Sequence, residues 1–319
     1  MNLSLLVTRP LPESVIHAID PQFDVTVRST NTPMTSEECA TALSAYDAIL
    51  PTLGDVFNAD AFRATTAMRC RVLANFGVGY NHIDVSAAAA AGVVVSNTPG
   101  AVTDATSDIA LTLILMTARR AGEGERLLRA DKWEGWHPTQ LLGRHVTGAT
   151  LGVIGMGRIG KAIAKRGHYG FDMPVVFFNR SKVEDPGVPA QQLPTITDVL
   201  KTADFVVLAV PASAETLHLI GAAELSAMRS DGYLINISRG NVIDEAALVS
   251  ALKTGEIAGA GLDVYEFEPN VPKELAALEQ VTLLPHLGTA ALNVRTEMGM
   301  MAVSNLKAFV EGADLPNRV

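Results

Sequence analysis

Short apolar runs alternate with amphipathic segments over the first 98 residues of the chain. The apolar runs are typical of buried strands, and the segments between them have helical spacing. We expect strands at 3–8, 24–28, 48–50, 72–75 and 93–96, and helices at 13–19, 60–68 and 85–91. This alternation predicts a parallel sheet that is covered by helices.

A second alternating region extends from about residue 149 to residue 286. Its expected strands are 151–154, 175–178, 205–208, 233–237, 258–262 and 281–284. Parallel strands joined by crossover helices make a doubly wound (Rossmann) sheet. We expect one long helix at 103–129 and another at 289–311, and the latter should return to the first domain. The prediction is a two-domain α/β protein with a discontinuous first domain (1–98 and 287–319) and a dinucleotide-binding domain (99–286).

A glycine-rich turn, TLGVIGMGRIG at 150–160, lies between an expected strand and an expected helix. Gly155 permits the tight turn, Gly157 lets the backbone approach a pyrophosphate, and Gly160 lets the helix pack closely on the strand. The free N–H groups at the helix N-terminus favour an anion. The turn therefore predicts a dinucleotide site; a glycine-rich turn without a ligand is the alternative.

The next strand is followed by Asn179, Arg180 and Ser181. NAD-binding turns carry an acidic residue about 20 positions further on, which receives the ribose 2′-hydroxyl. Asn179 is neutral, and the guanidinium of Arg180 can bind a 2′-phosphate in a bidentate manner. This run favours NADP(H), with NAD(H) still possible; otherwise Arg180 is a solvated loop arginine.

Composition excludes several classes of protein. The net charge of −9 argues against nucleic acid as a partner, and 48% hydrophobic residues among 319 support a full core. The chain has no apolar stretch of about 18 residues and no signal-peptide pattern at its start, so we expect no membrane segment and a cytoplasmic location. Cys39 and Cys70 form no disulfide framework, and no histidine pair has metal-ligand spacing. We therefore expect no metal.

Six motifs carry a family resemblance. They are the glycine turn, NFGVGYNHID at 75–84, NTPGAVTDATSD at 97–108, INISRGNVID at 235–244, GLDVYEFEP at 261–269 and PHLGTA at 285–290. With these motifs the chain resembles the D-isomer-specific 2-hydroxyacid dehydrogenase family over nearly its whole length. Residues 179–181 and the segment KWEGWHP at 132–138 make it most similar to the NADPH-dependent glyoxylate/hydroxypyruvate reductases of that family. The resemblance implies a flavodoxin-like substrate domain and a homodimer.

Reduction of a 2-keto acid requires a group that holds the carboxylate and a group that protonates the carbonyl oxygen. Arg239 follows the expected strand 233–237, at the end of the sheet where ligands bind. Its guanidinium group can bind a carboxylate in a bidentate manner. His286 also follows a strand and suits the general acid, since a neighbouring carboxylate keeps an imidazole protonated near neutral pH. The family pattern places Glu268 beside it, although Glu266 is the alternative from the residues alone.

The resemblance implies further contacts. The backbone N–H groups of Val78 and Gly79 would bind the substrate carboxylate, Leu53 would contact its apolar side, and Trp136 would reach the active site of the partner in a dimer. Each also has an ordinary explanation: Val78 and Gly79 could form a glycine turn, Leu53 could pack within a loop, and Trp136 could be an exposed aromatic residue. The cofactor-binding residues would be Thr103, Gly155, Gly157, Arg158, Ile159, Gly160, Asn179, Arg180, Ser181, Val210, Pro211, Thr216, Ile237, Ser238, Asp263 and Gly288. Thr103 and Thr216 could equally cap helices.

Together these features predict an NADPH-dependent reductase of a small 2-keto acid, glyoxylate or hydroxypyruvate, which yields the 2-hydroxy acid. One alternative is a dehydrogenase of a larger 2-hydroxy acid or of phosphite, since inorganic anions also suit an arginine. Another is a dinucleotide-sensing protein without catalysis, because the family includes transcriptional co-repressors.

Overall fold

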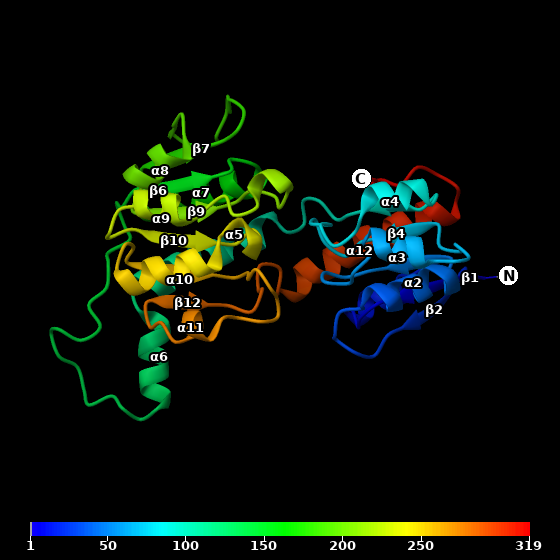
Figure 1. Cartoon of the computed structure of the whole chain (residues 1–319), viewed down its shortest axis with the longest axis horizontal. Coiled ribbons are helices and arrows are strands. Elements are labelled where there is room, and N and C mark those ends of the chain that lie inside the picture. The colour runs from blue at the N-terminus through cyan, green and yellow to red at the C-terminus, as the bar shows by residue number, and fades with distance from the viewer. Residues whose placement is uncertain (1) are drawn as a thin grey trace. The chain divides into compact units, whose positions relative to one another are not determined.

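The computed structural model describes residues 2–319, which divide into two compact units. The first unit comprises the chain up to Val102 together with Ala290–Val319, and the second comprises Thr103–Thr289. In Figure 1 the strands of the first unit run from blue to cyan and those of the second from green to orange. Each unit contains one parallel sheet with helices, so the α/β prediction is confirmed.

The first unit is built on a five-stranded sheet. Its strands are β1 (Leu3–Val7), β2 (Phe23–Val27), β3 (Ala48–Leu50), β4 (Val72–Ala74) and β5 (Val94–Ser96). All pairs are parallel, in the order β2-β1-β3-β4-β5. This is the strand order of flavodoxin-like folds.

Five helices belong to the same unit: α1 (Glu13–His17), α2 (Ser36–Ala45), α3 (Ala59–Ala64), α4 (Val85–Ala90) and α12 (Leu292–Val310). The hydrophobic pattern did not predict α2, which begins with a capping box between Thr35 and Glu38. The C-terminal helix α12 packs on α1 so closely that a Cβ at Gly299 would lie 2.4 Å from a methyl carbon of Val15. Residues near both ends of the chain therefore share one core.

The second unit contains a seven-stranded parallel sheet. Its strands are β6 (Leu151–Ile154), β7 (Val175–Phe178), β8 (Ala190–Gln192), β9 (Phe205–Leu208), β10 (Tyr233–Asn236), β11 (Gly259–Leu262) and β12 (Val281–Leu283). The order is β12-β11-β10-β9-β6-β7-β8, which contains the doubly wound Rossmann arrangement. The hydrophobic pattern predicted six of these strands but not β8, an edge strand whose three residues include two glutamines and no buried side chain.

The helices of the second unit are α5 (Thr103–Ala118), α6 (Ala121–Arg129), α7 (Arg158–Phe171), α8 (Ile196–Thr202), α9 (Ala222–Ala227), α10 (Glu245–Thr254) and α11 (Lys273–Ala276), with 3-10 turns at Ala214–Thr216 and Gly240–Val242. The expectation of one helix over 103–129 was wrong. The carbonyl of Ala118 accepts from the backbone N–H of Arg144 at 2.8 Å, and Arg120 adopts a left-handed backbone with φ 52°. A contact from distant sequence thus ends α5.

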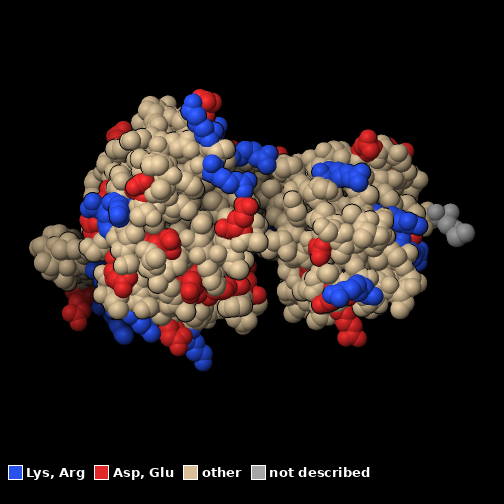
Figure 2. Space-filling view, turned by 45° about the horizontal axis from the view of Figure 1, so that its top comes forward, with Lys and Arg blue, Asp and Glu red and all other residues tan. Residues whose placement is uncertain are grey.

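The surface carries charges of both signs. Figure 2 shows Lys and Arg side chains interspersed with Asp and Glu on the face it presents, rather than gathered into one basic band. Among residues 2–319, no helix combines the length and the apolar character that a bilayer crossing requires.

Candidate active site

Arg239 lies in the turn that follows β10, and a buried asparagine fixes this turn. The side-chain amide of Asn236 donates from Nδ2 to the Arg239 carbonyl at 2.8 Å, and its Oδ1 accepts from the Ser238 N–H at 3.0 Å. Arg239 Nη1 donates to the Ser238 carbonyl at 2.7 Å. Burial lowers the pKa of Arg239, and the negative charge of Glu268 opposes that shift. The guanidinium remains a cation at any working pH.

His286 and Glu268 form a hydrogen-bonded pair at the ends of the two neighbouring strands β12 and β11. The distance between His286 Nδ1 and Glu268 Oε2 is 2.9 Å, and the two side chains are 29% and 32% exposed. The Tyr265 N–H donates to the other carboxylate oxygen, Oε1, at 3.1 Å. Because Nδ1 faces the carboxylate, Nε2 is the ring atom that can exchange a proton with a substrate.

The charge state of Glu268 suits this pairing. Burial alone would raise the pKa of this carboxyl. The hydrogen bond and charge of His286, the N–H of Tyr265 and the charge of Arg239 outweigh burial, so that the pKa lies below its usual value. Glu268 is therefore ionised at neutral pH and presents a negative charge to the imidazole.

Glu266 has a different partner. Its Oε1 lies 2.7 Å from Nε2 of His218, and this hydrogen bond raises the pKa of His218. Of the two glutamates that the sequence left as alternatives, the structure places Glu268 against His286. The roles of these side chains remain predictions.

Asp263 holds the loop that carries His286. Its side chain is buried, and its two oxygens accept from the backbone N–H groups of Leu287 at 2.6 Å and Gly288 at 2.8 Å. Its backbone carbonyl accepts from the His286 N–H at 2.9 Å. Burial raises the pKa of Asp263, although both N–H groups oppose this. The predicted cofactor residue thus also orders the neighbouring loop.

The glycine turn between β6 and α7 has the shape that a dinucleotide requires. A Cβ at Gly155, whose φ is 99°, would lie 2.7 Å from the Ala209 carbonyl oxygen, and one at Gly160 would lie 2.2 Å from the Gly155 carbonyl oxygen. A Cβ at Gly157 would meet no protein atom within 4 Å. Among the described residues 2–319, no side chain caps the start of α7, where Arg158 and Ile159 follow Gly157. The open side of Gly157 and the uncapped helix fit a pyrophosphate.

Side chains of the segment after β7, residues 179–181, already bond to other groups of the protein. Asn179 Oδ1 accepts from the Met156 N–H at 3.2 Å, and its Nδ2 donates to the Ser181 carbonyl at 3.0 Å. Arg180 is 86% exposed, and its Nη1 lies 2.5 Å from Glu215 Oε2. Asn179 therefore ties this run to the glycine turn, whereas the guanidinium of Arg180 is paired with a surface carboxylate.

The loop after β9 contains three predicted cofactor residues, Val210, Pro211 and Thr216. Thr216 Oγ1 donates to the Pro211 carbonyl at 2.8 Å and accepts from the Ser213 N–H at 2.8 Å. The bond with Ser213 belongs to the capping box of the 3-10 turn at Ala214–Thr216, and a capping role is the alternative that the sequence left open for Thr216. The Arg180–Glu215 ion pair connects this loop with the run after β7.

In the first unit, two asparagines hold the loop that contains Val78 and Gly79. Asn75 Nδ2 donates to the carbonyls of Gly77 and Gly79, each at 3.0 Å. Asn97 Nδ2 donates to the Val78 carbonyl at 2.8 Å. Three successive carbonyls are thus bonded within the unit, and the loop has a defined backbone conformation.

The remaining substrate-site candidates lie on irregular segments. The carbonyl of Leu53 accepts from Arg9 Nη1 at 2.6 Å. Trp136 is 80% exposed and lies in the segment between α6 and β6, which runs as an open loop in Figure 1. Trp133 and Leu142 in the same segment are also exposed.

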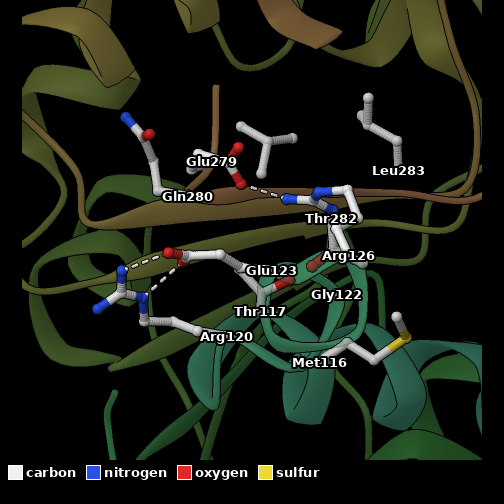
Figure 3. Close-up of a pocket in the computed structure, with 11 residues that line it drawn as sticks. Met116, Thr117, Arg120, Gly122, Glu123, Arg126, Glu279, Gln280, Thr282 and Leu283 are labelled. Carbon is white, nitrogen blue, oxygen red and sulfur yellow. Dashed lines mark hydrogen bonds and ion pairs between the residues drawn. The ribbon is translucent and has the colours of Figure 1, made fainter. Parts of the chain in front are cut away.

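Figure 3 shows a pocket of the second unit that is distinct from these residues. Its lining comes from α5, α6 and β12 and includes the ion pairs Arg120–Glu123, at 2.8 Å, and Arg126–Glu279. Both arginines are paired with glutamates, and none of the predicted site residues lines the pocket. It carries no part of the predicted chemistry.

Sequence reasoning did not single out the residues that support the site. Asn236, Asn75 and Tyr265 all lie inside the quoted motifs, and each bonds the backbone or side chain of a candidate residue. For Asn75 and Asn236 the available signal was a polar residue at the end of a buried strand, since buried polar groups require partners. Tyr265 acts through its backbone N–H, for which the residue type gives no signal.

Comparison with known proteins identifies the family of the chain. Residues 111–288, more than half of the chain, match the sequence profile of the NAD binding domain of D-isomer specific 2-hydroxyacid dehydrogenases. The chain belongs to this family. It is therefore an oxidoreductase, and the resemblance identified from the sequence is confirmed.

Relatives within the family have matching lengths. The glyoxylate reductases of Pyrococcus horikoshii and Thermococcus kodakarensis are each 40% identical over 324 residues, which cover all of this chain and 96% of the relative. The NADPH-dependent glyoxylate/hydroxypyruvate reductase of Sinorhizobium meliloti, solved in complex with NADP and malonate, is 34% identical with a TM-score of 0.86. That match covers 100% of this chain and 97% of the solved one.

Proposed function

We propose that the protein reduces a small 2-keto acid, glyoxylate or hydroxypyruvate, to the 2-hydroxy acid with NADPH. The observation that carries this proposal is the 2.9 Å contact between His286 and Glu268, with Arg239 close enough for its charge to act on Glu268. A cation for a carboxylate and a carboxylate-supported imidazole are the groups that keto-acid reduction requires. The names of the relatives, glyoxylate reductases, support the substrate class.

Each group has a defined task in this proposal. Arg239 binds the substrate carboxylate and polarises the carbonyl, and His286 donates a proton from Nε2 to the carbonyl oxygen. Glu268 orients the imidazole and stabilises its charged form before transfer. The backbone N–H groups of Val78 and Gly79 bind the carboxylate, and Leu53 contacts the apolar side of the substrate. We assign residues 1–98 and 287–319 to a substrate-binding domain, which contains Leu53, Val78 and Gly79, and residues 99–286 to a dinucleotide-binding domain, which also contains Arg239, Glu268 and His286.

The chain's residues would hold NADPH, which supplies the hydride when bound. The turn at Gly155–Gly160 would contact the pyrophosphate, since Gly157 is open on its outer side. Arg180 and Ser181 would bind the 2′-phosphate. The other proposed contacts are Thr103, Asn179, Val210, Pro211, Thr216, Ile237, Ser238, Asp263 and Gly288.

A homodimer completes the proposal. The exposed Trp133, Trp136 and Leu142 lie in one segment, and several large apolar side chains exposed in one segment favour a protein partner. Trp136 would then contact substrate in the active site of the second subunit. We propose a cytoplasmic location. Sedimentation of the purified protein at micromolar concentration tests the dimer, and a fully active monomer would contradict it.

The test of function is a reduction assay. Purified protein is mixed with glyoxylate or hydroxypyruvate and with NADPH or NADH, and loss of the reduced-nicotinamide absorbance is followed. Rapid oxidation of NADPH and slower oxidation of NADH is the expected result. A preference for NADH would remove the assigned phosphate-binding role of Arg180. Binding of cofactor without turnover of either acid would favour a larger keto acid, phosphite or the sensor function.

A further inference from the structure

Glu245 is a buried carboxyl that the proposed mechanism does not use. It is the first residue of α10 and is only 5% exposed. Its Oε1 accepts from the backbone N–H of Glu266 at 2.8 Å. Within residues 2–319, Oε2 is buried without a hydrogen-bond partner. Burial of a carboxyl costs free energy, so its position requires an explanation.

The start of α10 does not supply that explanation. Asp244 already caps the helix by accepting from the Ala247 N–H at 3.0 Å. An acidic residue in the first turn also favours the helix dipole, but an exposed side chain would provide the same interaction. Burial instead raises the pKa of Glu245, and the charges of Glu266 and Glu268 raise it further, against the effect of the Glu266 N–H.

Two loops of the candidate site meet beside Glu245. Gly240, which follows Arg239, lies so close to the next loop that a Cβ there would be 1.7 Å from the Tyr265 carbonyl carbon. Only a glycine permits this approach of two backbones. The Glu245–Glu266 hydrogen bond joins the same two segments a few residues further along. Tyr265, which directly precedes Glu266 in the chain, donates its N–H to Glu268 Oε1 at 3.1 Å.

We propose that Glu245 is a positioning residue whose bond to the Glu266 N–H fixes the loop 265–268 and thereby holds Glu268 on His286. The catalytic consequence rests on the proposed function, whereas the effect on the loop does not. Loss of the acceptor should loosen the loop, whereas loss of the charge alone should not. Glu245→Gln keeps an acceptor oxygen in the same shape, and Glu245→Met keeps the approximate volume but removes the acceptor.

Amide hydrogen exchange tests the loop without any need for turnover. Exchange is measured by mass spectrometry on peptides that span residues 263–270. In the wild type the Glu266 amide should be protected; E245M should exchange it about tenfold faster or more, and E245Q should stay within about threefold of wild type. Glu224→Met is the matched control, because Glu224 also accepts a backbone N–H, that of Gly221 at 3.1 Å, at the start of α9. It should not alter exchange in 263–270.

Either of two exchange results would overturn the proposal. One is an unprotected Glu266 amide in the wild type, a measurement that needs no variant and holds even where E245M fails to fold. The other is equal protection in wild type and a folded E245M.

Kinetics test the catalytic consequence. With kcat expressed per bound NADPH, E245M should lose about 10- to 100-fold in kcat while the KM for NADPH stays within about twofold, and E245Q should restore most of the rate. If Glu245 acts through Glu268, E245M should cost little further activity in a Glu268→Gln background. A fully additive loss, or a normal kcat in E245M with a loosened loop, would refute the positioning role. Absence of turnover in the wild type, with protection as expected, would refute the proposed function alone.

Discussion

His286 Nδ1 and Glu268 Oε2 lie 2.9 Å apart on loops that follow the adjacent strands β12 and β11. The contact gives the two ring nitrogens different environments, because the carboxylate lies at Nδ1 and Nε2 is the nitrogen that we propose transfers a proton. Asp263 and Tyr265 hold the same loops by hydrogen bonds, and these bonds fix the geometry of the His286–Glu268 pair at this end of the sheet.

Glu268→Gln should lower kcat by at least about tenfold, because the imidazolium loses the charge that stabilises it. NADPH affinity, measured by fluorescence titration, should not change. Glu266→Gln is the matched control, since that carboxylate pairs with His218 instead, and it should keep kcat within about twofold. Equal losses in the two variants would show that the pairing with His286 has no special role.

Arg239→Lys should raise the KM for the keto acid by about 10-fold or more, because lysine keeps the charge but lacks the bidentate fork. Steady-state kinetics with glyoxylate at saturating NADPH measure this. Arg229→Lys, at an arginine whose partner is Asp231 at 2.9 Å, should have no such effect. An unchanged KM in R239K would exclude Arg239 as the carboxylate-binding group.

Glu215→Gln should tighten NADPH binding about two- to fivefold, because Arg180 then loses the carboxylate that competes with a 2′-phosphate. The gain is small because both side chains are exposed. Arg180→Gln should weaken NADPH binding, and neither variant should change the dissociation constant of NADH. Titrations with both cofactors distinguish these outcomes, and parallel changes for NADPH and NADH would rule out the phosphate contact.

The pH dependence of stability should carry the signature of Glu268. Its pKa in the folded protein lies below the usual value of about 4.5, so its contribution to stability is present above pH 4.5 and is lost as the pH falls through the lower folded pKa. The difference in Tm between wild type and Glu268→Gln should therefore shrink from pH 6 towards pH 3. Calorimetry measures both proteins, and a difference that grows on acidification would have the wrong sign.

Local sequence patterns predicted most of the fold because buried strands and the glycine turn are encoded by adjacent residues. The features they missed depend on distant contacts. The strand β8 exists through its pairing with β7, although two of its three residues are glutamines. The end of α5 depends on the N–H of Arg144, far along the chain from Ala118.

The candidate site shows the same division. Arg239 and His286 could be found because each follows an apolar strand within a motif. The choice between Glu266 and Glu268 could not be made from the residues alone, because it depends on the folded loop. The loop brings Glu266 to His218 and Glu268 to His286. Glu245 gave no signal at all, because its partner is a backbone N–H from another loop.

The most direct test of the account is the rate of NADPH oxidation with hydroxypyruvate in His286→Ala beside His218→Ala. Both imidazoles contact a glutamate, at 2.9 and 2.7 Å, but only His286 is assigned to proton transfer. The account predicts that H286A loses about 10²- to 10⁴-fold in kcat with NADPH binding intact, and that H218A stays within about twofold of wild type. Near-normal turnover by H286A would contradict it.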